Sequence, residues 1–131
     1  MYAHKIQRKA ASAGFDWDGA EGALPKIGEE LSELADAIAA DRPNAPQDTM
    51  SPRDEGAVRD ELGDLLFAVV NVARHLKVDP EAALREATAK FRRRFTAVEA
   101  LAAERGSELS DLDLAQLDLL WEEVKAGEPA S

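Results

Sequence analysis

Two short acidic motifs hold the residues whose types and spacing best suit chemistry. They are Glu29-Glu30-Leu31-Ser32-Glu33 and Glu61-Leu62-Gly63-Asp64, and each holds carboxylates three residues apart. That spacing places two side chains on the same face of a helix. Carboxylate oxygens in this number suit a hard divalent cation such as Mg²⁺ or Mn²⁺. The candidate metal ligands are therefore Glu30, Glu33, Glu61 and Asp64.

The four acids can meet only if two helices bring them to one side of a contact. At about 100° per residue, Glu30 and Glu33 lie roughly 80° and 140° to one side of the apolar stripe of their helix. Glu61 and Asp64 lie at the same angles on the same side of theirs. The positions of the two acid pairs along the helices also match. The first pair lies roughly 13 Å before the end of its helix, and the second lies roughly 16 Å after the start of its helix. An antiparallel pair of helices would therefore bring all four carboxylates to one flank, whereas a parallel pair would separate them.

The segment from Leu62 to Ala73 is unusually apolar, and only Asp64 and Asn71 in it are polar. Such a run predicts a helix that is buried between neighbours. An ionised carboxylate at Asp64 would be costly there unless a cation pairs with it, which favours the metal site. The alternative stays open, because a chain with 26 acidic residues often carries Glu-Glu-x-x-Glu on a solvated helix face.

The same segment indicates an oligomer. Phe67 and Val70 are expected to point away from the main stripe, roughly 160° and 100° off it. One chain of 131 residues has few helices with which to cover every side of this segment. We therefore expect a symmetric homo-oligomer, a homodimer or a homotetramer.

The fold class is all-α, because strand signals are almost absent and helix signals recur throughout. We expect a single domain over residues 1–131, an antiparallel bundle of about five helices. Gly14 and Gly106 are expected to end two of the helices, and Ser51-Pro52 and Asp79-Pro80 to start two others. The expected helices span about 2–13, 21–40, 52–77 and 80–104, and a last one runs from a cap at 110–113 to about 126.

The composition excludes several classes of protein. Hydrophobic residues make up 45% and charged residues 32%, which is typical of a globular chain. The formal net charge of −10 argues against nucleic-acid and membrane partners. There is no cysteine, and hence no thiolate metal site. With no signal peptide and no membrane-spanning run, a cytoplasmic protein is expected.

Cationic and aromatic residues are available for a phosphorylated substrate. Lys90 and Arg94 flank a Phe91/Phe95 stripe, and Lys26 lies one turn before the first acid pair. The alternative is a solvated basic face. Phe15, Trp17 and Trp121 are able to stack on a nucleobase, although such residues are more often core plugs or helix staples. His75, a lone histidine near a helix end, is interpreted as structural.

Together these residues resemble the MazG family of nucleotide pyrophosphohydrolases. The family pattern, Glu-Glu-x-x-Glu followed by Glu-x-x-Asp, is met by the two acidic motifs. The resemblance extends to Gly14-Phe15-Asp16-Trp17, to residues 61–76, to Lys90-Phe91-x-Arg93-Arg94-Phe95 and to Trp121. It implies Mg²⁺-dependent hydrolysis of standard or non-standard nucleoside triphosphates to monophosphate and pyrophosphate, in an all-α oligomer.

The resemblance also implies roles for individual residues. It places metal ligation on Glu30, Glu33, Glu61 and Asp64, phosphate contacts on Lys90, Arg94 and Lys26, and nucleotide contact on Trp121. Glu29 would assist catalysis, and orienting the attacking water is one role open to it. The chain departs from the family at Thr88, where an Asn is expected, and in a long proline-rich loop over 41–50.

Two other classes of protein remain as alternatives. One is a catalytically idle nucleotide-binding or regulatory domain that keeps the fold. The other is an interaction bundle with a solvated acidic face. Binding of Mn²⁺ would separate the enzyme and the idle domain from the interaction bundle. Release of pyrophosphate would separate the enzyme from the idle domain.

Overall fold

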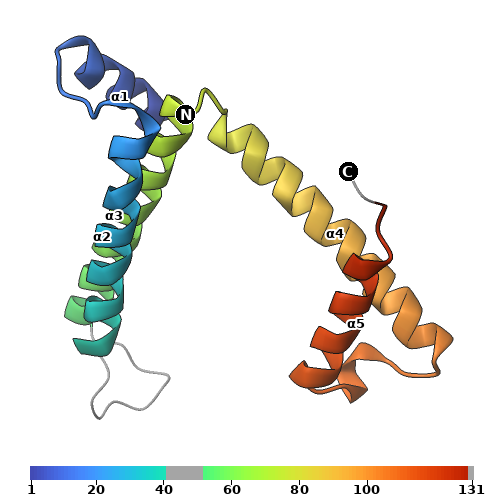
Figure 1. Ribbon diagram of the computed structural model, residues 1–131. Helices are drawn as coiled ribbons and strands as arrows, with labels where there is room; N and C mark the ends of the chain where they lie inside the picture. The colour runs from blue at the N-terminus through green and yellow to red at the C-terminus, as the bar shows by residue number, and fades with distance from the viewer. Residues whose placement is uncertain (41–51, 130–131) are drawn as a thin grey trace. The chain divides into compact units, whose positions relative to one another are not determined.

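The computed structural model describes residues 1–40 and 52–129, and this part of the chain contains helices and no strand. The prediction of an all-α chain with about five helices is confirmed (Figure 1). The proline-rich loop over 41–50 and the predicted cap Ser51 lie outside the described residues. The helices are α1 (Tyr2–Ser12), α2 (Gly19–Ala40), α3 (Pro52–His75), α4 (Pro80–Glu104) and α5 (Leu114–Ala126), with a 3₁₀ turn, η1 (Leu109–Asp111), before α5.

Local sequence signals account for most helix ends. Gly14 and Gly106 follow α1 and α4 with φ of +91° and +78°, a conformation that glycine adopts without strain. Asp113 caps α5 by accepting from the backbone N–H of Gln116, whose side chain accepts in return from the N–H of Asp113. The predicted boundaries are wrong by two residues at the end of α3, where Lys77 takes the left-handed conformation with φ of +59°.

The chain forms two compact units, Met1–Glu81 and Ala82–Ser131. In the first unit, α2 and α3 lie side by side and run in opposite directions (Figure 1), as the acid motifs required. Helix α1 also contacts α3, and Gln7 on α1 donates a hydrogen bond to the backbone oxygen of Phe67. This hairpin with its added helix positions the candidate site.

The apolar segment of α3 is less buried than its composition predicted. Ala68, Val70 and Val72 are buried, but Leu66 and Phe67 are 58% and 46% exposed. Val70 was expected to point away from the main stripe and to be left for another subunit, but this chain itself buries Val70. Its position lies one turn beyond Phe67, where α1 crosses α3. Within the first unit, α1 and α2 therefore cover only part of the circumference of α3.

The connector between α1 and α2 is held by Asp16. Its Oδ1 accepts from Nη2 of Arg74 and lies 2.9 Å from Nε2 of His75. Hydrogen bonding to Arg74 lowers the pKa of Asp16 from an ordinary 3.8 to about 2, and His75 and the backbone N–H of Trp17 contribute to the same shift. His75 thus has a structural contact, as expected.

The second unit packs α5 against α4 through a small core. Val98, Ala102 and Leu120 are buried at its centre, and Trp121 packs against them. Arg105, directly after α4, donates from Nη2 to Glu123 on α5. In the described part of the chain, no helix combines the length and apolarity that crossing a membrane requires.

Candidate metal centre and adjoining cavity

The acidic motifs of α2 and α3 meet in the first unit. One carboxylate oxygen each from Glu30, Glu33 and Glu61 lies within 4.8 Å of the others. A second group with the same spacing consists of Asp60, Glu61 and Asp64. Glu61 belongs to both groups, and among the described residues no group within this distance holds all four predicted ligands. Asp60 was not part of the predicted motif. It joins the second group because it directly precedes Glu61 on α3.

Asp64 does not occupy the environment that its apolar neighbours suggested. It is exposed, whereas Glu30 is 6% exposed and Glu61 is half-buried. The expectation of a buried Asp64 is therefore wrong for the described chain, because α1 and α2 leave that flank of α3 open. The least exposed acids of the cluster are Glu30 and Glu61, one from each helix of the hairpin.

Two oxygens of the cluster lack partners. Oε2 of Glu30 and Oε2 of Glu61 are both buried and make no hydrogen bond within the described residues. A buried carboxylate oxygen without a donor is costly. A donor set made only of carboxylate oxygens also has the chemistry that Mg²⁺ and Mn²⁺ prefer. The residues present thus fit a hard divalent cation.

The acids of the cluster differ in how readily they ionise, because Lys26 contacts only some of them. Nζ of Lys26 lies 2.9 Å from Oε1 of Glu30 and 3.9 Å from Oε2 of Glu29. Hydrogen bonding to Lys26 lowers the pKa of Glu30. The pKa of Glu33 is raised, first by hydrogen bonding to Glu30 and then by the negative charges of Glu30 and Glu61. Glu30 is therefore the more strongly anionic of the two, and its hydrogen bond and charge make Glu33 harder to ionise.

A cavity of about 450 Å³ adjoins the acids. This volume falls within the range of small-molecule pockets. Lys26, Glu30 and Asp64 line one part of it, and Trp17, which was predicted to contact substrate, lines another. The remaining wall is largely apolar and comes from α1, the connector and α3: Ile6, Ala10, Phe15, Phe67 and Ala68.

Sequence reasoning missed two polar residues of this wall, Gln7 and Asn71, which are each 5% exposed. Asn71 was visible as a polar interruption of the apolar segment. Gln7 gave no signal, because its place depends on how α1 crosses α3.

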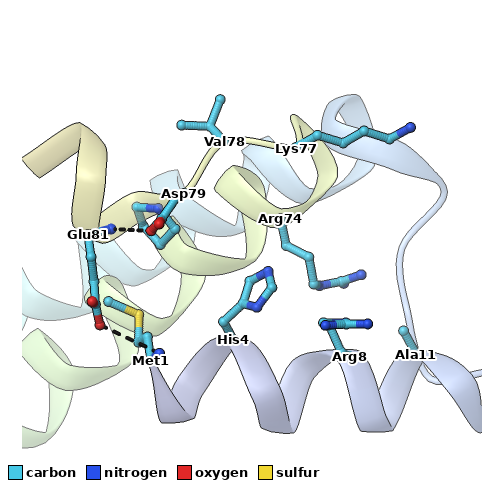
Figure 2. Close-up of a pocket in the computed structure, with 10 residues that line it drawn as sticks. Met1, His4, Arg8, Ala11, Arg74, Lys77, Val78, Asp79 and Glu81 are labelled. Atoms are coloured by element: carbon cyan, nitrogen blue, oxygen red, sulfur yellow. Dashed lines mark hydrogen bonds and ion pairs between the residues drawn. The ribbon is translucent and has the colours of Figure 1, made fainter.

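A second cavity, of about 660 Å³, lies between α1 and the turn that joins α3 to α4 (Figure 2). Arg8 and Arg74 extend into its space from α1 and α3, and Glu81 forms an ion pair with the amino group of Met1. None of the predicted metal ligands lines it. Its size alone therefore does not make it the candidate site.

The remaining predicted residues lie in the second unit. Arg94 forms a bidentate ion pair with Glu128, with Nε–Oε1 and Nη2–Oε2 distances of 2.7 and 2.9 Å. Its guanidinium carbon also lies 5.9 Å from the centre of the Trp121 ring. Trp121 contacts Phe91 and packs on the core, while Lys90 is exposed. Thr88, at the position of the expected Asn, donates to the backbone oxygen of Leu84.

The first unit is thus a helical scaffold that brings together acids able to hold a metal ion, with a cavity beside them. Residues 19–98 match the MazG nucleotide pyrophosphohydrolase domain, and the chain belongs to this family.

Two curated relatives match over nearly the whole chain, and a third matches over part of it. A protein of Thermotoga maritima, named nucleoside triphosphate pyrophosphohydrolase/pyrophosphatase MazG, is 42% identical over 96% of this chain and 44% of its own length. A nucleoside triphosphate pyrophosphohydrolase of Escherichia coli K12 is 40% identical over 98% of this chain and 45% of its own length. The uncharacterized protein YabN of Bacillus subtilis is 49% identical over 59% of this chain and 16% of its own length. The chain therefore spans less than half of the first two relatives.

Proposed function

We propose that this chain hydrolyses nucleoside triphosphates to nucleoside monophosphates and pyrophosphate in a reaction that depends on Mg²⁺ or Mn²⁺. The observation that carries the proposal is a pair of buried, unpartnered carboxylate oxygens, on Glu30 and Glu61, beside an apolar cavity with aromatic residues in its wall. Family membership and the names of the two longer relatives support the same reaction.

The acids of the hairpin would hold the cation. Glu30 and Glu61 supply the buried oxygens, and Glu33 and Asp64 complete the set from the same two helices. A divalent ion bound there neutralises triphosphate charge and lowers the pKa of the attacking water. Glu29 is mostly exposed and lies next to Lys26, and from the edge of the cluster it would orient that water.

Cationic side chains would bind the phosphates. Lys26 already lies at the border between the acids and the cavity, where a phosphate oxygen is able to replace a carboxylate as its partner. Arg94 presents its guanidinium to the two oxygens of Glu128, the same bidentate geometry that phosphate uses. Lys90, four residues earlier on α4, would add a point charge.

Aromatic residues would hold the base. Trp17 and Phe15 line the apolar part of the cavity, and stacking on a base suits their exposed faces. Trp121 packs against the core of the second unit and is only partly buried, and its exposed part would contact the nucleotide. A homodimer or homotetramer would cover the apolar surface that α3 exposes within the described chain.

The test is release of pyrophosphate from a panel of ribo- and deoxynucleoside triphosphates with Mg²⁺ or Mn²⁺ and with a chelator. Cation-dependent release by wild-type protein, its loss in Glu61→Gln and its retention in Glu108→Gln, a matched change at an exposed acid of the second unit, would support the proposal. Nucleotide binding without any release would instead identify an idle nucleotide-binding domain.

A further inference from the structure

The cavity beside the acids is bounded on its α1 side by the side chain of Gln7. Its Nε2 donates to the backbone carbonyl of Phe67 at 2.8 Å. A carbonyl oxygen only accepts, so this contact fixes which end of the amide faces α3. The other end, Oε1, is buried and has no hydrogen-bond partner in the described part of the chain. A molecule that fills the cavity is the natural source of the missing donor.

Asn71 offers the opposite group from the α3 side of the same cavity. Its Oδ1 accepts from Nη2 of Arg74 at 2.7 Å. An arginine has only donors, so the orientation of this amide is fixed as well, and Nδ2 is left as its donor. Arg74 is itself bound to Asp16 of the connector, which holds Asn71 in place. Two residues of the cavity wall therefore carry one acceptor, Oε1 of Gln7, and one donor, Nδ2 of Asn71, each in an amide whose orientation is fixed.

We infer that Gln7 and Asn71 read the Watson–Crick edge of a nucleobase and select one that has an amino group beside an unprotonated ring nitrogen on that edge, namely cytosine or adenine. The amino N–H donates to Oε1 of Gln7, and the ring nitrogen accepts from Nδ2 of Asn71. Uracil and hypoxanthine carry a carbonyl oxygen and a protonated nitrogen at the same two positions. In the pose that the phosphates impose on cytosine or adenine, they would set acceptor against acceptor and donor against donor.

This inference rests on the proposed function, because the acids and Lys26 at the other part of the cavity define where the phosphates of the same molecule lie. The apolar wall near Phe15 and Trp17 gives the faces of the base an apolar surface and makes no choice among bases. Selection therefore falls to the two amides, whose unpaired groups discriminate more sharply than an apolar contact does.

The experiment compares kcat/KM for CTP with that for UTP, and for ATP with that for ITP, by release of pyrophosphate. Wild-type protein is expected to prefer the amino-bearing member of each pair by about tenfold or more, which corresponds to ~1.4 kcal/mol. Gln7→Met keeps the length of the side chain but removes the acceptor. In this variant the CTP/UTP and ATP/ITP ratios should both fall to about twofold or less. Asn71→Asp keeps the oxygen that Arg74 needs but replaces the donor, and should also lower both ratios.

Lys9→Gln, at an exposed position of the same helix as Gln7, is the matched control and should leave both ratios unchanged. A merely structural role of the amides would lower turnover of both members of a pair equally. Ratios near one in wild-type protein, or unchanged in both variants, would overturn the inference. If Gln7→Met fails to fold, the wild-type ratios and Asn71→Asp still decide.

Calorimetric binding of CMP and UMP separates this inference from the proposed function. Tighter binding of CMP by wild-type protein that is lost in Gln7→Met would support base selection even if no triphosphate is hydrolysed. Pyrophosphate release without any preference would uphold the reaction and refute the selection.

Discussion

The ammonium nitrogen of Lys26 lies 2.9 Å from Oε1 of Glu30, so the acid cluster contains a cation from its own helix. The two residues are four apart on α2, and Glu30 is the most buried acid of the cluster. The pair satisfies one oxygen of Glu30 and leaves the other, Oε2, without a partner. Lys26 therefore balances part of the charge that a divalent cation would otherwise balance.

Lys26→Met should lower the free energy of unfolding without divalent cations, because Glu30 then stays buried without its partner. Mn²⁺ should raise the melting temperature of the variant more than that of wild-type protein, since no ammonium group competes for Glu30. Thermal unfolding with and without Mn²⁺ measures both effects. Lys5→Met, at an exposed position of α1, serves as the control. Equal Mn²⁺ shifts in both proteins would show that Lys26 and the cation do not share Glu30.

Glu61→Gln should abolish metal-dependent turnover while the protein stays folded, because it removes the charge of the residue that both acid groups share. Asp64→Asn should do the same from the exposed side of the cluster. Turnover within about tenfold of wild type, no more than ~1.4 kcal/mol of barrier, would remove that residue from the metal site. Pyrophosphate release with saturating Mg²⁺ is the measurement, and circular dichroism checks the fold.

The sequence predicted the meeting of Glu30 with Glu61, because helical period and the direction of the two helices determine both positions. It did not predict the exposure of Asp64, which depends on which neighbour covers one flank of α3. It also missed Gln7, whose role depends on a contact with Phe67 across 60 residues of chain. Local periodicity holds no information on such packing.

Asp16→Asn should destabilise the protein in a pH-dependent way. The pKa of Asp16 in the fold, about 2, is below its ordinary value of 3.8, so the contact with Arg74 contributes fully above 3.8 and is lost as the pH falls through about 2. The stability difference between wild-type protein and the variant should therefore shrink toward zero over that window. Urea unfolding between about pH 2 and pH 4 measures this difference.

Asp18→Asn is the control, because it makes the same charge change two residues further along the chain. Its stability should stay within ~0.5 kcal/mol of wild type. A pH-independent difference for Asp16→Asn would contradict the ion pair.

Glu128→Gln should lower the KM for nucleoside triphosphates, because Arg94 would no longer be neutralised by the bidentate pair. Little stability should be lost, since solvent screens an ion pair that is partly exposed. Glu123→Gln, which breaks the exposed pair with Arg105, is the matched control and should leave KM unchanged. If KM is the same in both variants and in wild-type protein, Arg94 has a structural role and does not contact phosphate.

Leu66→Glu should weaken self-association. Leu62, Leu66 and Val69 recur at helical spacing on α3 and are 45%, 58% and 42% exposed, so they form an apolar stripe that the hairpin leaves uncovered. A second copy of the chain would bury this stripe, and a carboxylate placed in its middle would be desolvated without a partner. Sedimentation at low micromolar concentration should show an oligomer for wild-type protein and a smaller species for Leu66→Glu. Leu114→Glu makes the same change at an exposed leucine of α5 and should leave the oligomer intact. A folded, fully active wild-type monomer at that concentration would refute the interface.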